Sequence, residues 1–376
     1  PRVVKSPAWR EETFIKCIMG NTVLQHNKVF YRALPKVELH RHLEGSLRIR
    51  TMMDVSRAHN LGLLDTNYLR PLVQVNPDDP YTSQNFLSKF QMLRKFYRSP
   101  EVIQRITCEA IADAAADNVV YMELRFTPVA LSRVEGFPLG DVIDWVIEAT
   151  HKANQKFGCT TRLIVSVNRH ESVELAAEVI ALAADRMDAG VVGVDMAGDE
   201  TQFPAPPFSD LFAEAQQAGL HVTIHAGEWG GADNVANAIT LLGAERIGHG
   251  VRVLEDPAVV SMARERGTVF EVCVTSNIQS GVVPSLGVYP LSDMLAEGLN
   301  VTVNTDDPSI SKITLSDEYR LVCEDLGLRL EELQQQVLTA AQAAFLPQDE
   351  RGKLARQIEQ QFKTVRKNGR DRELRS

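Results

Sequence analysis

The amino-acid sequence predicts an α/β fold, a (β/α)8 TIM barrel with inserted helices after the first strand and further helices at the C-terminus. Two observations predict this fold. Eight short runs rich in β-branched residues alternate with longer helical patterns along the chain. Several of these runs are apolar almost throughout, as parallel strands buried on both faces are. Strict alternation of eight such units favours a closed barrel over an open doubly wound sheet.

The expected strands share this apolar, β-branched character and cover residues 37–42, 119–126, 161–167, 191–196, 221–225, 246–251, 268–274 and 300–304. The expected helices between the later strands carry apolar residues at helical spacing, and each runs into a glycine: residues 171–189, 208–218 and 233–242. A glycine just past the last periodic residue is a typical helix end, because it adopts the left-handed backbone conformation without strain.

The segment after the first strand is oversized for a simple connection. Residues 46–118 contain helical patterns at 85–97 and 101–116. We expect this helical insertion to lie at the C-terminal face of the barrel, where it would serve as a lid or, alternatively, only as packing.

The rest of the chain is assigned to one domain with flanking segments. We take residues 1–33 as an N-terminal extension and residues 34–376 as a single barrel domain. We expect helices over 316–346 and 347–367, with Pro347 near a helix start, and a frayed end over 368–376.

Composition excludes several function classes. The chain has 376 residues, of which 44% are hydrophobic and 24% charged, which is ordinary for a globular enzyme. A net charge of −9 without a basic stretch argues against nucleic-acid binding. Five scattered cysteines without a Cys-x-x-Cys pair indicate a reducing compartment. The sequence has no apolar run of membrane-spanning length, and its start does not resemble a signal peptide, so we expect a cytoplasmic protein.

His40 and His42 stand one residue apart at the end of the first expected strand. Alternate side chains of a strand face the same side, so both imidazoles point one way. Two neutral imidazoles on one strand form half of a zinc site. A His-x-His pair on a strand without a metal is also common, so the pair by itself leaves both interpretations open.

Polar residues follow most of the later strands as well. In a parallel barrel the carboxyl ends of all strands meet at one rim, where active sites form. The residues expected at this rim are Asp199, Glu200, His225, Glu228, His249, residues 275–277, Asp306 and Asp307. Four histidines and an adjacent carboxylate pair on one rim indicate a catalytic metal centre.

The number of candidate ligands fits one zinc ion per chain. Three imidazole nitrogens and one carboxylate oxygen leave room for a water, whose pKa zinc lowers to about 7; the residues are His40, His42, His225 and Asp306. Glu228 is then available to carry a proton, and His249 to orient or deprotonate the water. Asp307 is available to hold a substrate, and Gly198 lets a ligand approach the backbone closely.

Five motifs resemble the adenosine deaminase family of the amidohydrolase superfamily, and they are closest to its bacterial-type members. They are LPKVELHRHLEG at 34–45, DMAGDE at 195–200, HAGE at 225–228, RIGHG at 246–250 and NTDDP at 304–308. They stand in family order over residues 34–345, and CVTSNIQSG at 273–281 is also similar to the bacterial members. The resemblance implies that a zinc-bound hydroxide deaminates adenosine or 2′-deoxyadenosine to inosine or 2′-deoxyinosine plus ammonia.

The resemblance also implies a role for each matching residue. Glu228 would protonate purine N1, His249 would lie beside the attacking hydroxide, and Asp307 would face N7. The Gly198 backbone would meet N3, and Glu44, where many relatives have Asp, would reach the sugar. The zinc ligands, of which His42 also borders the substrate, would be His40, His42, His225 and Asp306. Relatives that act on adenine, aminodeoxyfutalosine or N6-methyl-AMP share this frame, so those substrates are the alternatives.

Three other functions are less well supported by the sequence. A binuclear amidohydrolase often carries a carboxylated lysine at the end of the fourth strand, and residues 194–198 contain none. A metal-free binding or scaffold barrel would be distinguished by its zinc content. A nucleic-acid deaminase of the cytidine type needs His-x-Glu with Pro-Cys-x-x-Cys, which the sequence lacks.

Overall fold

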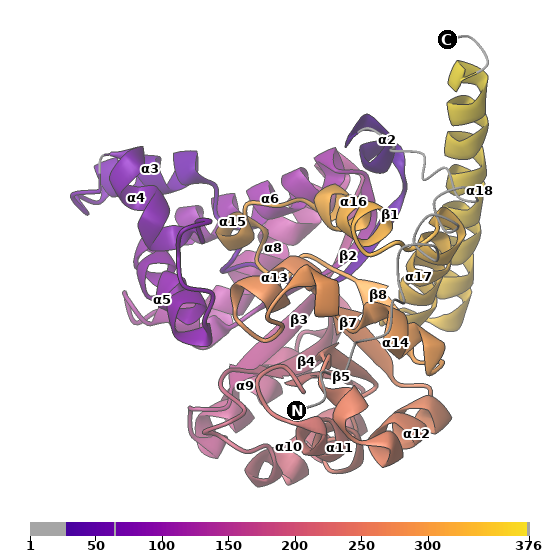
Figure 1. The fold of residues 1–376 in the computed structure, drawn as a ribbon. Helices are drawn as coiled ribbons and strands as arrows, with labels where there is room; N and C mark the ends of the chain where they lie inside the picture. Colours follow the sequence, from indigo (N-terminus) through magenta and orange to yellow (C-terminus); the bar gives the residue numbers. More distant parts are fainter. Residues whose placement is uncertain (1–27, 64, 374–376) are drawn as a thin grey trace, which may run out of the picture.

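The computed structural model describes residues 28–63 and 65–373, with the backbone alone at 368–373. Its centre is one parallel sheet of eight strands, in which every strand pairs with the next one along the chain. The strands are β1 Lys36–His42, β2 Val119–Phe126, β3 Thr160–Asn168, β4 Val191–Ala197, β5 His221–Ala226, β6 Arg246–His249, β7 Val269–Val272 and β8 Asn300–Val303. Helices surround this sheet (Figure 1).

The sheet closes where the chain just beyond β8 meets β1. The Asp306 amide donates to the His40 carbonyl at 3.0 Å, and the His42 amide donates to the Asp306 carbonyl at 2.9 Å. The Leu39 amide donates to the Asn304 side-chain oxygen at 2.9 Å. The predicted (β/α)8 barrel is therefore confirmed.

Some element boundaries differ from the prediction. β6 ends at His249, two residues early, because His249 has a φ of +61°, and the left-handed conformation interrupts a strand. β7 ends at Val272, and the chain turns at once into helix α13, Val274–Gln279. The single helix predicted over 171–189 is split into α9, Val173–Ala184, and the short helix η2, Met187–Ala189.

The other helices that follow barrel strands form the outer layer. Their bounds are α7 Pro128–Ser132, α8 Leu139–Phe157, η3 Pro206–Phe208, α10 Ser209–Gln217, α11 Ala232–Thr240, η4 Val253–Glu255, α12 Pro257–Arg266, η5 Leu286–Val288 and α14 Leu291–Ala296.

The insertion after β1 is helical, as predicted, and most of it projects from one side of the barrel (Figure 1). It consists of α3 Ile49–Ala58, α4 Thr66–Val73, α5 Ser83–Leu93, η1 Arg94–Phe96 and α6 Pro100–Ala116. Side-chain caps fix the starts of α5 and α6. The side chain of Thr82 accepts from the Asn85 amide, and that of Ser99 from the Val102 amide.

The C-terminal helices are α15 Pro308–Ser311, α16 Leu315–Glu324, α17 Leu330–Ala343 and α18 Gln348–Glu373, and α17 packs against β1 and β8. Of these helices, α15 lies beside the insertion, where the Val75 amide donates to the Ile310 carbonyl at 2.9 Å, whereas α17 and α18 lie on the other side of the barrel (Figure 1). α18 extends six residues past the predicted end at 367, so most of the tail expected to fray is helical. Residues 374–376 and most of the predicted extension, 1–27, lie outside the described residues, while α2, Lys28–Ala33, packs near α16.

The barrel interior contains buried charges as well as apolar side chains. Arg246 Nε lies 2.6 Å from Glu271 Oε1, and Arg125 donates to Glu271 Oε2 at 2.7 Å. All three side chains are almost completely buried. Buried charges are tolerated when they are paired in this way, and this network lies directly beneath the histidines of β1. None of the helices in the described part of the chain is long and apolar enough to cross a membrane.

Candidate metal centre and active site

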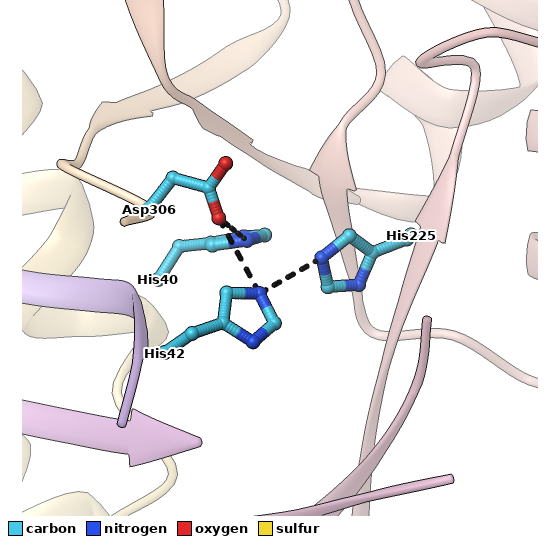
Figure 2. Close-up of side chains that lie close together, drawn as sticks. All are labelled: His40, His42, His225 and Asp306. Carbon is cyan, nitrogen blue, oxygen red and sulfur yellow. Dashed lines mark hydrogen bonds and ion pairs between the residues drawn. The ribbon is translucent and has the colours of Figure 1, made fainter. Parts of the chain in front are cut away.

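Three histidines and one aspartate converge at the carboxyl end of the barrel (Figure 2). His42 Nε2 lies 3.2 Å from His225 Nε2. Asp306 Oδ1 lies 3.2 Å from His40 Nε2 and 3.3 Å from His42 Nε2. One potential ligand atom from each residue lies within 4.8 Å of all the others. The structure thus brings together the four residues predicted as ligands, from β1, from β5 and from the turn after β8.

Hydrogen bonds to Nδ1 of two of the rings orient the opposite nitrogen, Nε2, toward a possible cation. His40 Nδ1 lies 2.9 Å from Glu271 Oε2, and His225 Nδ1 lies 2.9 Å from Asp195 Oδ1. Because a carboxylate only accepts, each Nδ1 carries the proton and each Nε2 presents its lone pair to the centre. Among the described residues, His40 Nε2 and Asp306 Oδ1 are buried without a hydrogen-bond partner. Converging lone pairs of this kind fit a divalent metal ion.

The charge states of His42 and His225 also suit a metal. Burial lowers the pKa of His42 well below its ordinary value, and the neighbouring His225 lowers it further. Burial likewise lowers the pKa of His225. Both rings are therefore neutral at physiological pH, which is the form that coordinates a metal.

A second group of possible ligands shares Asp306 with the first and adds His249 and Cys273. Burial raises the pKa of the Cys273 thiol well above its ordinary value, so the sulfur stays protonated and is a poor ligand. The Nδ1 atom of His249 is engaged at 3.0 Å by the amide of Asn277. The first group is the better site.

Glu228 and His249 stand beside the centre but outside the ligand group. Glu228 Oε2 lies 3.7 Å from His249 Nε2. Burial raises the pKa of Glu228 well above its usual range, and the nearby carboxylates of Asp306 and Glu200 raise it further. Both effects favour the protonated form of the Glu228 carboxyl group. Glu200 also shapes the loop that carries it by accepting from three backbone amides, those of Gly227, Glu228 and Gly230.

Asp307 and Glu44 are two further buried carboxyl groups at the site. Burial, with Asp306 and then Glu44 nearby, raises the pKa of Asp307 well above its ordinary value, which favours its protonated form. A side chain at Gly45 would place its Cβ 1.8 Å from Asp307 Oδ1, so only glycine fits there. Glu44 Oε1 accepts from the Thr127 amide at 2.7 Å. Within the described chain, Glu44 Oε2 and Asp307 Oδ1 are buried and have no hydrogen-bond partner.

These groups line one cavity of about 270 Å³. Gly198 contributes to its wall with a φ of +107°, and the nearest atom to a Cβ built there would be the Arg169 nitrogen at 3.7 Å. Large apolar side chains from α5 and from two loops after strands line the part of the cavity that we call its mouth: Phe86, Leu87, Phe90, Phe203 and Trp229. Part of the predicted insertion therefore lies at the cavity, and its movement as a lid stays a prediction.

The sequence analysis missed several residues that organise the site. Asp195 and Glu271 hold the rings of His225 and His40, and the guanidinium of Arg125 bridges the two carboxylates, at 3.5 Å and 2.7 Å. A signal for both acids was present, because each interrupts an otherwise apolar strand. Asn277 was noted only as a polar residue at a strand end, and Glu200 was noted without a role.

Comparisons with known proteins agree with this site. A family profile described as "Adenosine deaminase" matches residues 35–361. Adenosine deaminase of Klebsiella pneumoniae (strain 342) is 36% identical over 331 residues, covering 87% of this chain and 98% of the relative. The crystal structure of adenine deaminase from Arthrobacter aurescens superposes with a TM-score of 0.81 and 28% identity, covering 88% of this chain and 99% of that one. An amidohydrolase from Burkholderia ambifaria, solved with bound Zn, has a TM-score of 0.80 and 27% identity, covering 92% and 96%.

Proposed function

The chain belongs to the adenosine deaminase family, and we propose that it hydrolyses adenosine and 2′-deoxyadenosine to inosine and 2′-deoxyinosine. In this reaction the oxygen of one water bonds to purine C6, the C6–N bond breaks, and the amino group leaves as ammonia. The observation that carries the proposal is the group of possible metal ligands, His40, His42, His225 and Asp306, beside the two buried carboxyl groups of Glu228 and Asp307.

We propose that this group holds one zinc ion. The support is the set of converging lone pairs, of which those on His40 Nε2 and Asp306 Oδ1 have no hydrogen-bond partner in the described part of the chain. Zinc supplies, when bound, the acidity that makes a water nucleophilic at neutral pH. The Burkholderia amidohydrolase, which contains Zn, shares the fold.

The buried carboxyl groups can donate hydrogen bonds to nitrogen atoms of the purine ring that act as acceptors. Attack at C6 disrupts the aromatic ring and places charge on N1, so an acid must deliver a proton there. Glu228 keeps its proton because its pKa is raised by burial, and it lies beside the centre without being a ligand. N7 is an acceptor, which the protonated Asp307 can serve. N3 is a second acceptor, which the Gly198 backbone amide at the cavity wall can serve.

Glu44 supports a nucleoside as the substrate. Its Oε1 is fixed by the Thr127 amide, whereas its buried Oε2 is without a partner among the described residues and can accept from a sugar hydroxyl. Adenine has no such hydroxyl, and Glu44, whose pKa is raised by burial, offers no positive charge to a 5′-phosphate. Sites built to bond a hydroxyl discriminate strongly against ligands that lack it.

The test is ammonia release by the zinc-loaded protein from a panel of aminopurines. We expect the highest kcat/KM for adenosine and 2′-deoxyadenosine, with adenine, AMP, N6-methyl-AMP and aminodeoxyfutalosine lower. Adenine is a necessary member of the panel because the Arthrobacter relative is an adenine deaminase. A higher kcat/KM for adenine or AMP than for adenosine would overturn the nucleoside assignment.

A Glu44→Ala variant sharpens this test. It should raise KM for adenosine about tenfold, because loss of a hydrogen bond to a charged group typically weakens binding by about that factor. Its advantage for adenosine over adenine should shrink accordingly. If Glu44 only caps the turn near Thr127, the ratio of the two kcat/KM values will not change.

A further inference from the structure

Asn277 occupies a buried position between His249 and Tyr289 that the proposed function does not use. It lies in α13, which follows β7 directly and so brings its side chain beside the end of β6. Asn277 Nδ2 lies 3.0 Å from His249 Nδ1, and Asn277 Oδ1 lies 2.8 Å from the Tyr289 hydroxyl. Asn277 is fully buried and His249 is 1% exposed, so water does not compete for these contacts.

The contacts define the direction of the hydrogen bonds. The Tyr289 hydroxyl donates to Asn277 Oδ1, which leaves the amide NH2 facing the imidazole. An NH2 group only donates, so His249 Nδ1 must accept and the ring proton must be on Nε2.

The other side of the His249 ring favours the same tautomer. Nε2 lies 3.9 Å from Asp306 Oδ2 and 3.7 Å from Glu228 Oε2. An N–H at this position is attracted to the Asp306 carboxylate, whereas a lone pair would be repelled by it.

We propose that Asn277, oriented by Tyr289, is a positioning residue that holds His249 with its proton on Nε2, so that His249 donates a hydrogen bond to the attacking oxygen. The proposal rests on the proposed function for the identity of that oxygen. It decides between the two roles that the sequence leaves open for His249, because a ring that already carries its proton on Nε2 orients the nucleophile and does not deprotonate it.

The Nδ1 partners of the candidate ligands differ from that of His249, and this difference explains how histidine can serve both as a metal ligand and as a hydrogen-bond donor. Carboxylates face Nδ1 of His40 and His225, so these rings keep the proton on Nδ1 and present a bare Nε2. An amide donor faces Nδ1 of His249, so this ring presents an N–H at Nε2. The partner on Nδ1 therefore assigns each ring to metal binding or to hydrogen-bond donation.

The direct test is the ¹⁵N NMR spectrum of zinc-loaded protein labelled at histidine, in which N–H and bare ring nitrogens have distinct shifts. The His249 signals are assigned by their loss in His249→Gln. We expect N–H at Nε2 and a bare Nδ1 for His249, the reverse of His40 and His225. A proton on Nδ1 of His249 would overturn the proposal. This readout needs no substrate, so it stands even if adenosine is not deaminated.

Kinetic variants test the consequence for catalysis. Asn277→Leu removes the amide, and we expect kcat for adenosine to fall about 10²-fold, as for other lost transition-state donors, with KM within about threefold of the parent and zinc content unchanged. Tyr289→Phe only frees the amide to rotate and should lower kcat about fivefold. The control is Ser280→Ala, a buried polar residue just after α13, which should leave kcat unchanged. An Asn277→Leu enzyme with parental kcat would refute the positioning role.

The activity of the parent enzyme on adenosine distinguishes a failure of the Asn277 proposal from a failure of the proposed function. If the parent enzyme releases ammonia from adenosine but Asn277→Leu has parental kcat, the role of Asn277 is wrong and the proposed function survives. If the parent does not act on adenosine while the NMR tautomer is as expected, the proposed function is wrong and the tautomer assignment survives.

Discussion

The two ends of the cavity are built differently. At the metal end, the candidate ligands His40, His42, His225 and Asp306 stand on strands or directly after them, and buried acids hold two of the three rings. At the mouth, α5 and two loops supply apolar side chains, and Leu87 is 36% exposed. The metal end is almost fully buried, with the His42 side chain 11% exposed, whereas the mouth leaves apolar surface open to solvent.

This difference suggests that the metal end determines the chemistry and the mouth determines the choice of substrate. The barrel fixes the atoms that would attack and protonate a 6-aminopurine, because parallel strands bring their carboxyl ends to one rim. The mouth comes partly from the insertion, through α5, and partly from the loops after β4 and β5. Relatives with the same fold are named for adenosine and for adenine, as expected if the metal end is shared and the mouth varies. The following variants probe the metal end first and the mouth last.

The largest effect is expected from removing a ligand. His225→Ala should lose zinc and reduce ammonia release to background, because it removes a nitrogen ligand and leaves the buried Asp195 carboxylate without the ring that it orients. Chelation of the parent should have the same effect, and added zinc should restore activity. His221→Ala, on the same strand but partly exposed at its opposite end, is the matched control and should retain zinc. Two zinc ions per active chain by elemental analysis would contradict the single-ion site.

Glu228→Gln should reduce kcat about 10²–10⁴-fold, the usual range for general acid catalysis, while the zinc content stays the same. Because burial raises the pKa of Glu228, the parent should hold the catalytic proton at neutral pH. Its kcat/KM should therefore fall as pH rises through that raised pKa, and the glutamine variant should lack this alkaline decrease. Near-parental turnover of Glu228→Gln would show that another group supplies the proton.

Asp195→Asn tests the acids that hold the ligand rings. The amide can no longer enforce a proton on Nδ1 of His225, and such partners are typically worth about 10–100-fold in metal affinity. Competition with a chelator should show a loss of that size. Asp185→Asn, at the exposed end of α9, is the control. Unchanged zinc affinity would mean that His225 is oriented by the backbone of β5 alone.

The candidate zinc ligands could be predicted from the sequence because their positions follow from strand alternation and barrel topology. His40 and His42 alternate on one strand, and Asp306 follows the last strand, so their meeting point could be predicted from barrel topology. Asp195 and Glu271 were visible as charges inside apolar strands, but which ring each contacts depends on the folded barrel. Asp195 of β4 reaches His225 of the neighbouring strand β5, whereas Glu271 of β7 reaches His40 of β1, with which β7 does not pair. The mouth could not be predicted, because the place of α5 depends on how an irregular insertion packs.

The smallest effect is expected at the mouth, from Leu87→Ala. Leu87 lines the cavity yet is 36% exposed, so its truncation should cost little stability. If α5 closes over a bound nucleoside, the side chain becomes buried only in the complex. Truncation of Leu87 to alanine removes part of the apolar surface that would be buried in the complex, and it should therefore raise KM for adenosine about fivefold with kcat unchanged. Leu241→Ala, a similarly exposed leucine just after α11, should change neither constant. An unchanged KM in Leu87→Ala would mean that α5 stays open during turnover, and that the mouth selects substrates only through the polar groups beneath it.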